Sequence, residues 1–181
     1  MQSKLTSLAG ASALLLLTAC SGGGGGSSTP AASATTLVYT NPTGSGYLLL
    51  QDAASSGNTL VLDVVGPATP AAISGISFSF TASNITWTTP FVDGGTFNLG
   101  SAPLGLVSKV TSNELQGALA QKGTASPVSA SNSTVLAKIT MKLNSGVAPG
   151  TLAFADSGKS AVLNSGGVSS IAIAVGTLKA Q

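Results

Sequence analysis

The sequence contains no histidine and no arginine, and its only cysteine is Cys20. Catalytic triads that use a histidine base are therefore excluded, and so are zinc sites built from cysteine and histidine ligands. The sequence also lacks the Ser-x-x-Lys and Gly-x-Ser-x-Gly patterns, which excludes the common serine nucleophile motifs. With so few reactive groups, the chain is expected not to be an enzyme and to need no cofactor.

Charge is scarce as well. Charged residues make up 7% of the chain, and the formal net charge is +2. Proteins that bind nucleic acids gather lysine and arginine along one face, whereas the lysines here are scattered singly, so no nucleic-acid partner is expected. The sequence has no Asp-x-Asp-x-Asp-Gly loop, so no metal site is predicted, with a calcium ion at a sheet edge as the alternative.

Five acidic residues are the remaining groups that could support hydrolysis. A glycosidase needs two carboxyl groups a few ångströms apart. One acid falls on the outward face of an expected strand and three adjoin turns, where aspartate commonly accepts hydrogen bonds from backbone amides. Solvated or turn-capping roles are expected for them, and a carboxylate-dependent glycan hydrolase is the alternative. The five are Asp52, Asp63, Asp93, Glu114 and Asp156.

Long apolar runs are also few, and the clearest one lies at the N-terminus. Residues 1–19 combine Lys4, an apolar stretch from Leu5 to Leu17 and small residues before Cys20, which is typical of an export signal. The apolar stretch is too short to span a bilayer. The segment "LTAC" resembles the lipobox of bacterial lipoproteins. That resemblance implies that the Cys20 thiol carries a diacylglycerol anchor, and an unmodified thiol after an ordinary signal peptide is the alternative.

The segment after the cysteine predicts a tether. Five glycines, Gly22–Gly26, are followed by small residues to about Thr36, and such a composition buries too little apolar surface to fold. Residues 20–36 are thus expected to form a flexible linker with a reach of roughly 20 to 24 Å. Ser21 resembles the sorting residue of lipoproteins in Gram-negative bacteria, which implies attachment to the outer membrane of the cell envelope.

Residues 37–181 are expected to form one all-β domain. Apolar residues recur there with a period of two, most clearly in Leu60–Val64, Ile76–Phe80, Val135–Leu143 and Ile171–Val175. Eight or nine short strands separated by turn residues predict a two-sheet antiparallel β-sandwich, and a closed barrel is the alternative. The further strands are expected at Tyr47–Gln51, Gly95–Leu99, Leu106–Thr111, Leu115–Gln121 and Thr151–Phe154.

Three segments within this domain resemble the cohesin-like family. They are "NTLVLDVVGPATPAAISGISFSFTASNITWT", "STVLAKITMKLNSG" and "SSIAIAVGTLKAQ", and the resemblance covers about residues 45–181. It implies a jelly-roll sandwich of the superfamily that includes carbohydrate-binding modules, and a partner such as a dockerin-like protein. No contact residue of the family can be placed on this chain.

One motif matches a phosphate-binding loop on paper. Residues 153–160, "AFADSGKS", fit the relaxed pattern, but such a loop needs a helix that begins at its Lys-Ser pair. The next residues, "AVLNSGGVSS", contain two glycines and β-branched side chains that oppose a helix. A hairpin turn at Asp156–Lys159 is expected instead, and no nucleotide partner.

Aromatic residues make up only 4% of the chain, and two of them lie near expected loops in the segment "NITWTTPF". Sugar-binding sandwiches stack sugar rings on exposed aromatic faces. Trp87 and Phe91 are therefore the candidate binding residues for a carbohydrate, and the alternative is that Trp87 caps the core at one end of the sandwich.

The sequence as a whole predicts a non-enzymatic envelope lipoprotein with a cohesin-like module that binds or scaffolds a protein or a polysaccharide. The alternatives are the glycan hydrolase and a purely structural envelope protein.

Overall fold

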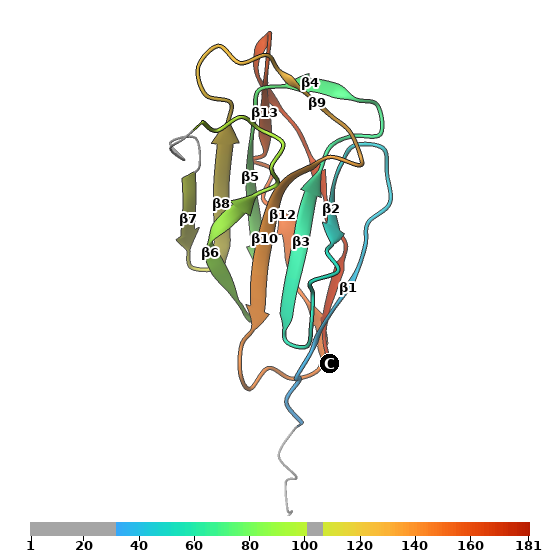
Figure 1. Ribbon diagram of the computed structural model, residues 1–181. Coiled ribbons are helices and arrows are strands. Elements are labelled where there is room, and N and C mark those ends of the chain that lie inside the picture. Colours follow the sequence, from blue (N-terminus) through green and yellow to red (C-terminus); the bar gives the residue numbers. More distant parts are fainter. Residues whose placement is uncertain (1–31, 101–106) are drawn as a thin grey trace, which may run out of the picture. The chain divides into compact units, whose positions relative to one another are not determined.

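The computed structural model describes residues 32–100 and 107–181. The predicted signal peptide, Cys20 and most of the predicted tether lie outside these residues. The ordered elements in the described ranges are all β-strands (Figure 1). Within the same ranges, no helix has the length and hydropathy needed to cross a bilayer.

Two sheets form the body of the domain. In the first, here called sheet I, all neighbouring strands are antiparallel except β15 and β2. Sheet I has the order β15 (Ile173–Ala174), β2 (Tyr47–Gln51), β3 (Thr59–Val65), β10 (Val135–Leu143) and β6 (Ile85–Asp93). Sheet II has the order β14 (Gly167–Ser170), β13 (Ala161–Asn164), β5 (Gly75–Ala82), β8 (Glu114–Ala120) and β7 (Val107–Thr111), and β12 (Phe154–Asp156) also pairs with β5.

Two small sheets complete the fold. One has the order β1 (Leu37–Thr40), β16 (Thr177–Ala180) and β11 (Gly150–Leu152), and the other pairs β4 (Ala71–Ile73) with β9 (Val128–Ala130). The backbone amides of Thr35 and Thr36 both donate to the carbonyl oxygen of Gln181, at 2.6 and 2.8 Å. The chain therefore enters the sandwich beside residue 181, at the end away from β4 and β9 (Figure 1).

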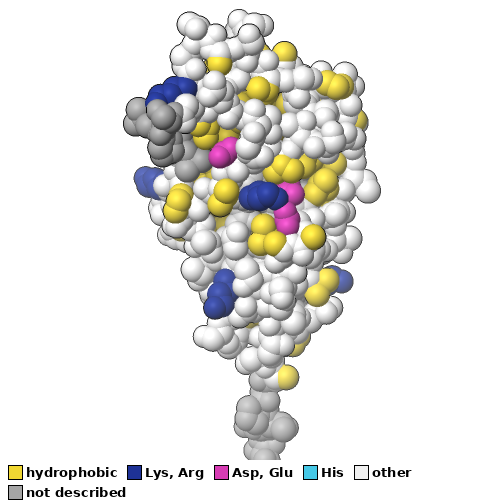
Figure 2. Space-filling model, in the orientation of Figure 1, with side chains coloured by type: hydrophobic (Ala, Val, Ile, Leu, Met, Phe, Trp, Pro, Cys, Tyr) yellow, Lys and Arg dark blue, Asp and Glu magenta, His cyan; other side chains and the backbone are white. Residues whose placement is uncertain are grey.

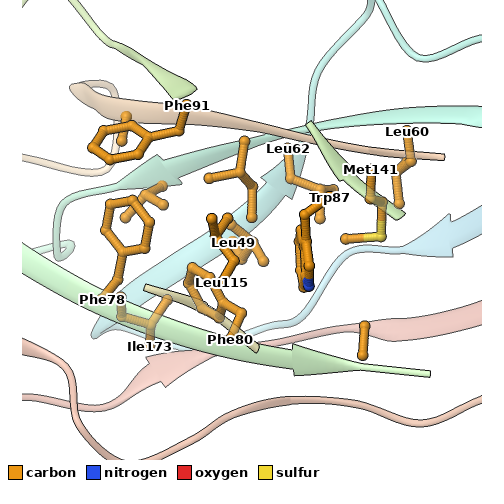
Figure 3. Packing of buried hydrophobic residues seen from close by; sticks show 14 of the residues in the cluster. Leu49, Leu60, Leu62, Phe78, Phe80, Trp87, Phe91, Leu115, Met141 and Ile173 are labelled. Atoms are coloured by element: carbon orange, nitrogen blue, oxygen red, sulfur yellow. The ribbon is translucent and has the colours of Figure 1, made fainter. Parts of the chain in front are cut away.

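The core lies between sheets I and II (Figure 3). Leu60, Leu62 and Val64 of β3 are fully buried, and Phe78 and Phe80 of β5 face them from the other sheet. Each such side chain contributes about 1.5 to 3 kcal/mol when it is fully buried. The period-two pattern of the sequence is confirmed in both strands, because alternate residues of a strand point to opposite faces.

Some expected strands differ in the structure. Residues 95–99 form no strand. They cross the sandwich end instead, where the Thr96 hydroxyl donates to the carbonyl oxygen of Val135 at 2.6 Å and the Asn98 amide to the Gln121 side chain at 2.5 Å. The expected strand Thr151–Phe154 is divided between β11 and β12, which belong to different sheets.

The expected hairpin turn at Asp156–Lys159 is wrong. β12 and β13 do not pair with each other, because both pair antiparallel with β5 and follow one another along its edge. Residues 157–160 therefore form a bulge between two segments that pair with the same side of β5. The bulge is held by Asp156, whose Oδ1 accepts hydrogen bonds from the Gly158 amide at 3.1 Å and the Ser160 hydroxyl at 2.9 Å. As the sequence predicts, no helix begins there.

Candidate functional site

The outer face of sheet II has small side chains along its middle. Ser77 of β5 lies opposite Ala118 of β8 on one side and opposite Ala161 of β13 on the other. Directly paired residues of antiparallel strands point to the same face, so these three form a row across the sheet. The larger side chains of the same strands, such as Phe78 and Leu119, point into the core. The result is a shallow depression on the outside.

One part of this depression, here called the apolar hollow, has a volume of about 200 Å³. Two exposed apolar side chains lie along it, Leu163 of β13 with 38% and Val168 of β14 with 76% of its surface exposed. Of the described residues, those that line the apolar hollow are all uncharged. They are Gly75, Ile76, Ser77, Ala118, Leu119, Ala120, Ala161, Val162, Leu163 and Val168.

A second part, here called the basic hollow, has a volume of about 340 Å³. It shares Ser77 and Ala118 with the apolar hollow, so the two adjoin on one face. Lys109 of β7 and Lys159 of the bulge bring positive charge to it. Its lining residues are Ser77, Phe78, Ser79, Lys109, Gln116, Gly117, Ala118 and Lys159.

Glu114 lies beside the basic hollow at the start of β8. Its Oε1 accepts hydrogen bonds from the Ser79 hydroxyl and, at 2.9 Å, from Lys159 Nζ. The Ser79 hydrogen bond, followed by those of Lys159 and Gln116, lowers the pKa of Glu114 to about 2. The carboxylate is thus ionised at neutral pH and serves as a fixed anion that orients Lys159. Its lowered pKa is the opposite of what a general acid needs, which is a raised pKa.

A second ion group lies on the outer face of sheet I. Lys138 Nζ donates to Asp63 Oδ1 at 2.8 Å and to Asp52 Oδ2. The shared ammonium group lowers the pKa of Asp52, and its hydrogen bonds to the two carboxylates raise the pKa of Lys138. Figure 2 shows that charged side chains are sparse on this face of the molecule.

The two carboxylates that contact Lys138 can be compared with the pair that the hydrolase alternative requires. Asp52 and Asp63 do come close together, as that alternative requires, but both contact the same ammonium group, and its hydrogen bond lowers the pKa of Asp52. A glycosidase needs one carboxyl group that stays protonated until it donates. The arrangement therefore provides an electrostatic link between β2, β3 and β10 and no acid and base pair.

The expected turn-capping roles of three aspartates are confirmed. Asp52 Oδ1 accepts from the Ala54 amide at 2.7 Å and Asp93 Oδ1 from the Gly95 amide at 2.6 Å, and Asp156 caps Gly158 as described above. Across residues 32–100 and 107–181, no group of three or more cysteine, histidine or acidic side chains lies close enough together to hold a metal ion.

The structure places Trp87 and Phe91 in the core (Figure 3). Trp87 is 6% exposed, and its Nε1 donates to the carbonyl oxygen of Asn113 at 3.1 Å. Phe91 is 2% exposed and packs edge-on against Phe78, with ring centroids 4.9 Å apart. Neither ring has a face open to a sugar, because β6 continues through this segment and pairs with β10, which turns both side chains inward.

The residues of the hollows were not singled out from the sequence. The available signal was the alternation of small and large side chains, with Ser77 and Ser79 between the apolar residues of β5, and Ala118 and Ala120 between those of β8. Such alternation indicates a face without bulky side chains. It does not reveal which strands lie next to each other, so the positions of Lys109 and Lys159 relative to this face could not be derived.

The sequence matches no family model and no curated protein. The fold is similar to solved structures. CaCohA2 from Clostridium acetobutylicum has 14% identity and a TM-score of 0.54, over 80% of this chain and 90% of that one. A type I cohesin in a cohesin–dockerin complex from Clostridium thermocellum has 12% identity and a TM-score of 0.53, over 78% and 95%.

A third similar structure is the sixth cohesin of scaffoldin B from Acetivibrio cellulolyticus, in complex with a Cel5 dockerin mutant. It has 15% identity and a TM-score of 0.52, over 73% of this chain and 96% of that one. Identities this low show the fold alone. The domain is a β-sandwich similar to that of the cohesins, as the sequence predicts.

Proposed function

We propose that this protein is a non-enzymatic docking module, and that the outer face of sheet II binds a partner protein. The observation that carries the proposal is the pair of adjoining hollows on that face. Exposed apolar side chains next to a hollow are typical of protein interaction sites, because a partner side chain that fills the hollow removes apolar surface from water. Leu163 and Val168 provide such surface here.

The class of partner follows from the similar structures. Two of them are complexes of a cohesin with a dockerin, one from Clostridium thermocellum and one from Acetivibrio cellulolyticus. Because this chain shares only the fold with them, the analogy names a class and no contact residue. A dockerin-like protein is the proposed partner.

The proposal includes a lipid anchor on Cys20 and attachment to the envelope, at the outer membrane of a Gram-negative host. The described chain joins the sandwich at β1, which pairs with β16 and belongs to neither sheet I nor sheet II. Mass spectrometry of the protein purified from its native host tests the anchor: acyl groups are expected on Cys20, and a free thiol would contradict the anchor without affecting the docking proposal.

The docking proposal is tested by affinity capture from envelope extract with two matched variants. Val168→Asp places a charge beside the apolar hollow, and Val92→Asp places the same charge on the outer face of sheet I, where Val92 is 60% exposed. Loss of a captured protein with Val168→Asp and its retention with both wild type and Val92→Asp would support the proposal. Equal capture by all three proteins, or retention of a polysaccharide that neither variant changes, would contradict it.

A further inference from the structure

The two hollows differ in charge, and this difference indicates what kind of partner fits them. The basic hollow is lined by Lys109 and Lys159, and the only acidic residue in contact with either of them in the described part of the chain is Glu114. Two lysines and one glutamate leave one net positive charge. Lys109 is exposed and makes no ion pair with any described residue.

Glu114 does not neutralise Lys109. Its Oε1 accepts from Ser79 and Lys159, which directs the carboxylate toward β5 and the bulge. The other acid of sheet II, Asp156, points away from this face. It pairs with the fully buried Phe80, and its Oδ2 accepts from the backbone amide of Ile173 in sheet I at 2.8 Å. Neither acid of sheet II therefore neutralises the positive charge of Lys109 on the outer face of that sheet.

The apolar hollow lies next to this charge. Leu163 and Lys109 are on strands separated by β5 and β8, which corresponds to three strand spacings, or roughly 14 Å across the sheet. Along the strands, Leu163 is in register with Ala120 of β8 and Lys109 with Gln116, which adds roughly 13 Å and makes the backbone separation roughly 20 Å. A helix of about 13 residues, or an extended segment of about six residues, spans that distance. One continuous segment of a partner could therefore contact both hollows.

We infer that the partner presents an acidic segment, in which an apolar side chain fills the apolar hollow and a carboxylate contacts Lys109. This inference rests on the proposed docking function and adds the chemistry of the partner. The apolar contact supplies most of the affinity, and the carboxylate supplies selectivity and faster association, because exposed charge pairs contribute little to affinity and are screened by salt.

The test is a selection from a random peptide library displayed on phage, with the full-length protein purified in detergent as the target. Peptides enriched by the wild-type protein are expected to combine aspartate or glutamate with a large apolar residue. Lys109→Glu is expected to reverse the preference, so that lysine and arginine replace the acids. Lys142→Glu, which makes the same change on the outer face of sheet I, is the matched control and should enrich the same peptides as wild type.

Affinity measurements with the most enriched peptide give the second part of the test. Lys109→Glu is expected to weaken binding about fivefold at 50 mM salt, and this effect should shrink toward none at 0.5 M salt, because the screening length there is only a few ångströms. Val168→Asp and Ala118→Trp should weaken binding at either salt concentration. Thermal melting curves confirm that each variant is folded, and Val168→Asp, at a highly exposed site, serves if Ala118→Trp does not fold.

The possible failures are distinguishable. Some enriched peptides could lose affinity with Val168→Asp, yet contain no excess of acidic residues or keep their acidic preference with Lys109→Glu. That result would overturn the inference and leave the docking function in place. Enriched peptides whose binding neither Val168→Asp nor Ala118→Trp weakens would overturn both.

Discussion

Gly117 of β8 lies directly over the ring of Phe78 of β5, between Gln116 and Ala118, which line the basic hollow. The Cβ atom of an alanine at position 117 would lie 2.7 Å from Phe91 Cε1 and nearer still to the Phe78 ring. These two rings pack against each other edge-on in the core. The absence of a side chain at Gly117 thus lets the aromatic pair reach the inner surface of the sheet, directly beneath the basic hollow.

Gly117→Ala is expected to destabilise the fold by about 1 to 3 kcal/mol, because the added methyl group forces buried rings to move in a closely packed core. Urea denaturation measures the change in the free energy of unfolding. Gly46→Ala is the matched control, since a Cβ at Gly46 meets no atom within 4 Å, and its effect should stay within about 0.5 kcal/mol. Equal effects of the two substitutions would contradict the packing role of Gly117.

Ser79→Ala is expected to raise the pKa of Glu114 from about 2 toward its ordinary value, because the Ser79 hydroxyl makes the largest contribution to the lowered pKa. An NMR titration of the Glu114 carboxyl group measures this directly. The folded-state pKa lies below the unfolded value, so the stabilisation is present above pH 4.5 and is lost as the pH falls toward 2. Between pH 4.5 and pH 2, the free energy of unfolding of Ser79→Ala should therefore fall less than that of the wild type. An unchanged Glu114 titration would show that the hydrogen bonds of Lys159 and Gln116 are sufficient.

Lys138→Met is expected to lower the urea midpoint at pH 7 more than at pH 3. At pH 7 the substitution leaves the Asp52 carboxylate beside Asp63 without their shared ammonium group, whereas protonation of Asp52 at low pH relieves this unfavourable arrangement. The pKa of Asp52 is lowered in the wild-type fold, so the wild-type advantage should disappear as the pH falls through the acid range. A midpoint difference that does not depend on pH would contradict a stabilising role for the charge pairing of Lys138, because methionine keeps an apolar stem of similar length.

The strands were predictable to a large extent, and their partners were not. The alternation of Leu60, Leu62 and Val64 with polar residues reflects a local property, the two faces of a strand, and all three side chains are buried as expected. Pairing is a property of distant segments. β5 contacts β8, β12 and β13, and nothing in its own residues specifies that two consecutive segments share one of its edges.

The same limit applies to the candidate site. Lys109 and Lys159 are separated by 50 positions in the sequence and meet on one face only through the register of β7, β8, β5 and the bulge before β13. Trp87 illustrates the opposite case. Its position near expected loops left an exposed ring and a ring that caps the core as alternatives, and the pairing of β6 with β10 extends the strand and turns the indole into the core.

Tyr39 provides a test at high pH. Its hydroxyl donates to the carbonyl oxygen of Leu49 at 2.9 Å and accepts from the amide of Gly176 at 2.7 Å, which links β1, β2 and the segment before β16. Burial raises the pKa of Tyr39 to about 12, and the Gly176 hydrogen bond opposes this only in part. The neutral phenol is therefore the form that the fold requires.

Tyr39→Phe is expected to destabilise the protein by about 1 to 3 kcal/mol at pH 7, because the buried Leu49 carbonyl and the half-buried Gly176 amide lose their partner. The unfolded chain releases the Tyr39 proton near pH 10 and the folded chain near pH 12. The stabilisation from this group is thus complete below pH 10 and declines as the pH rises between these values. Tyr47, whose pKa burial also raises, is present in both proteins. The difference in unfolding free energy between wild type and Tyr39→Phe, measured with urea from pH 8 to 12, should narrow above pH 10, and a constant difference would contradict the raised pKa of Tyr39.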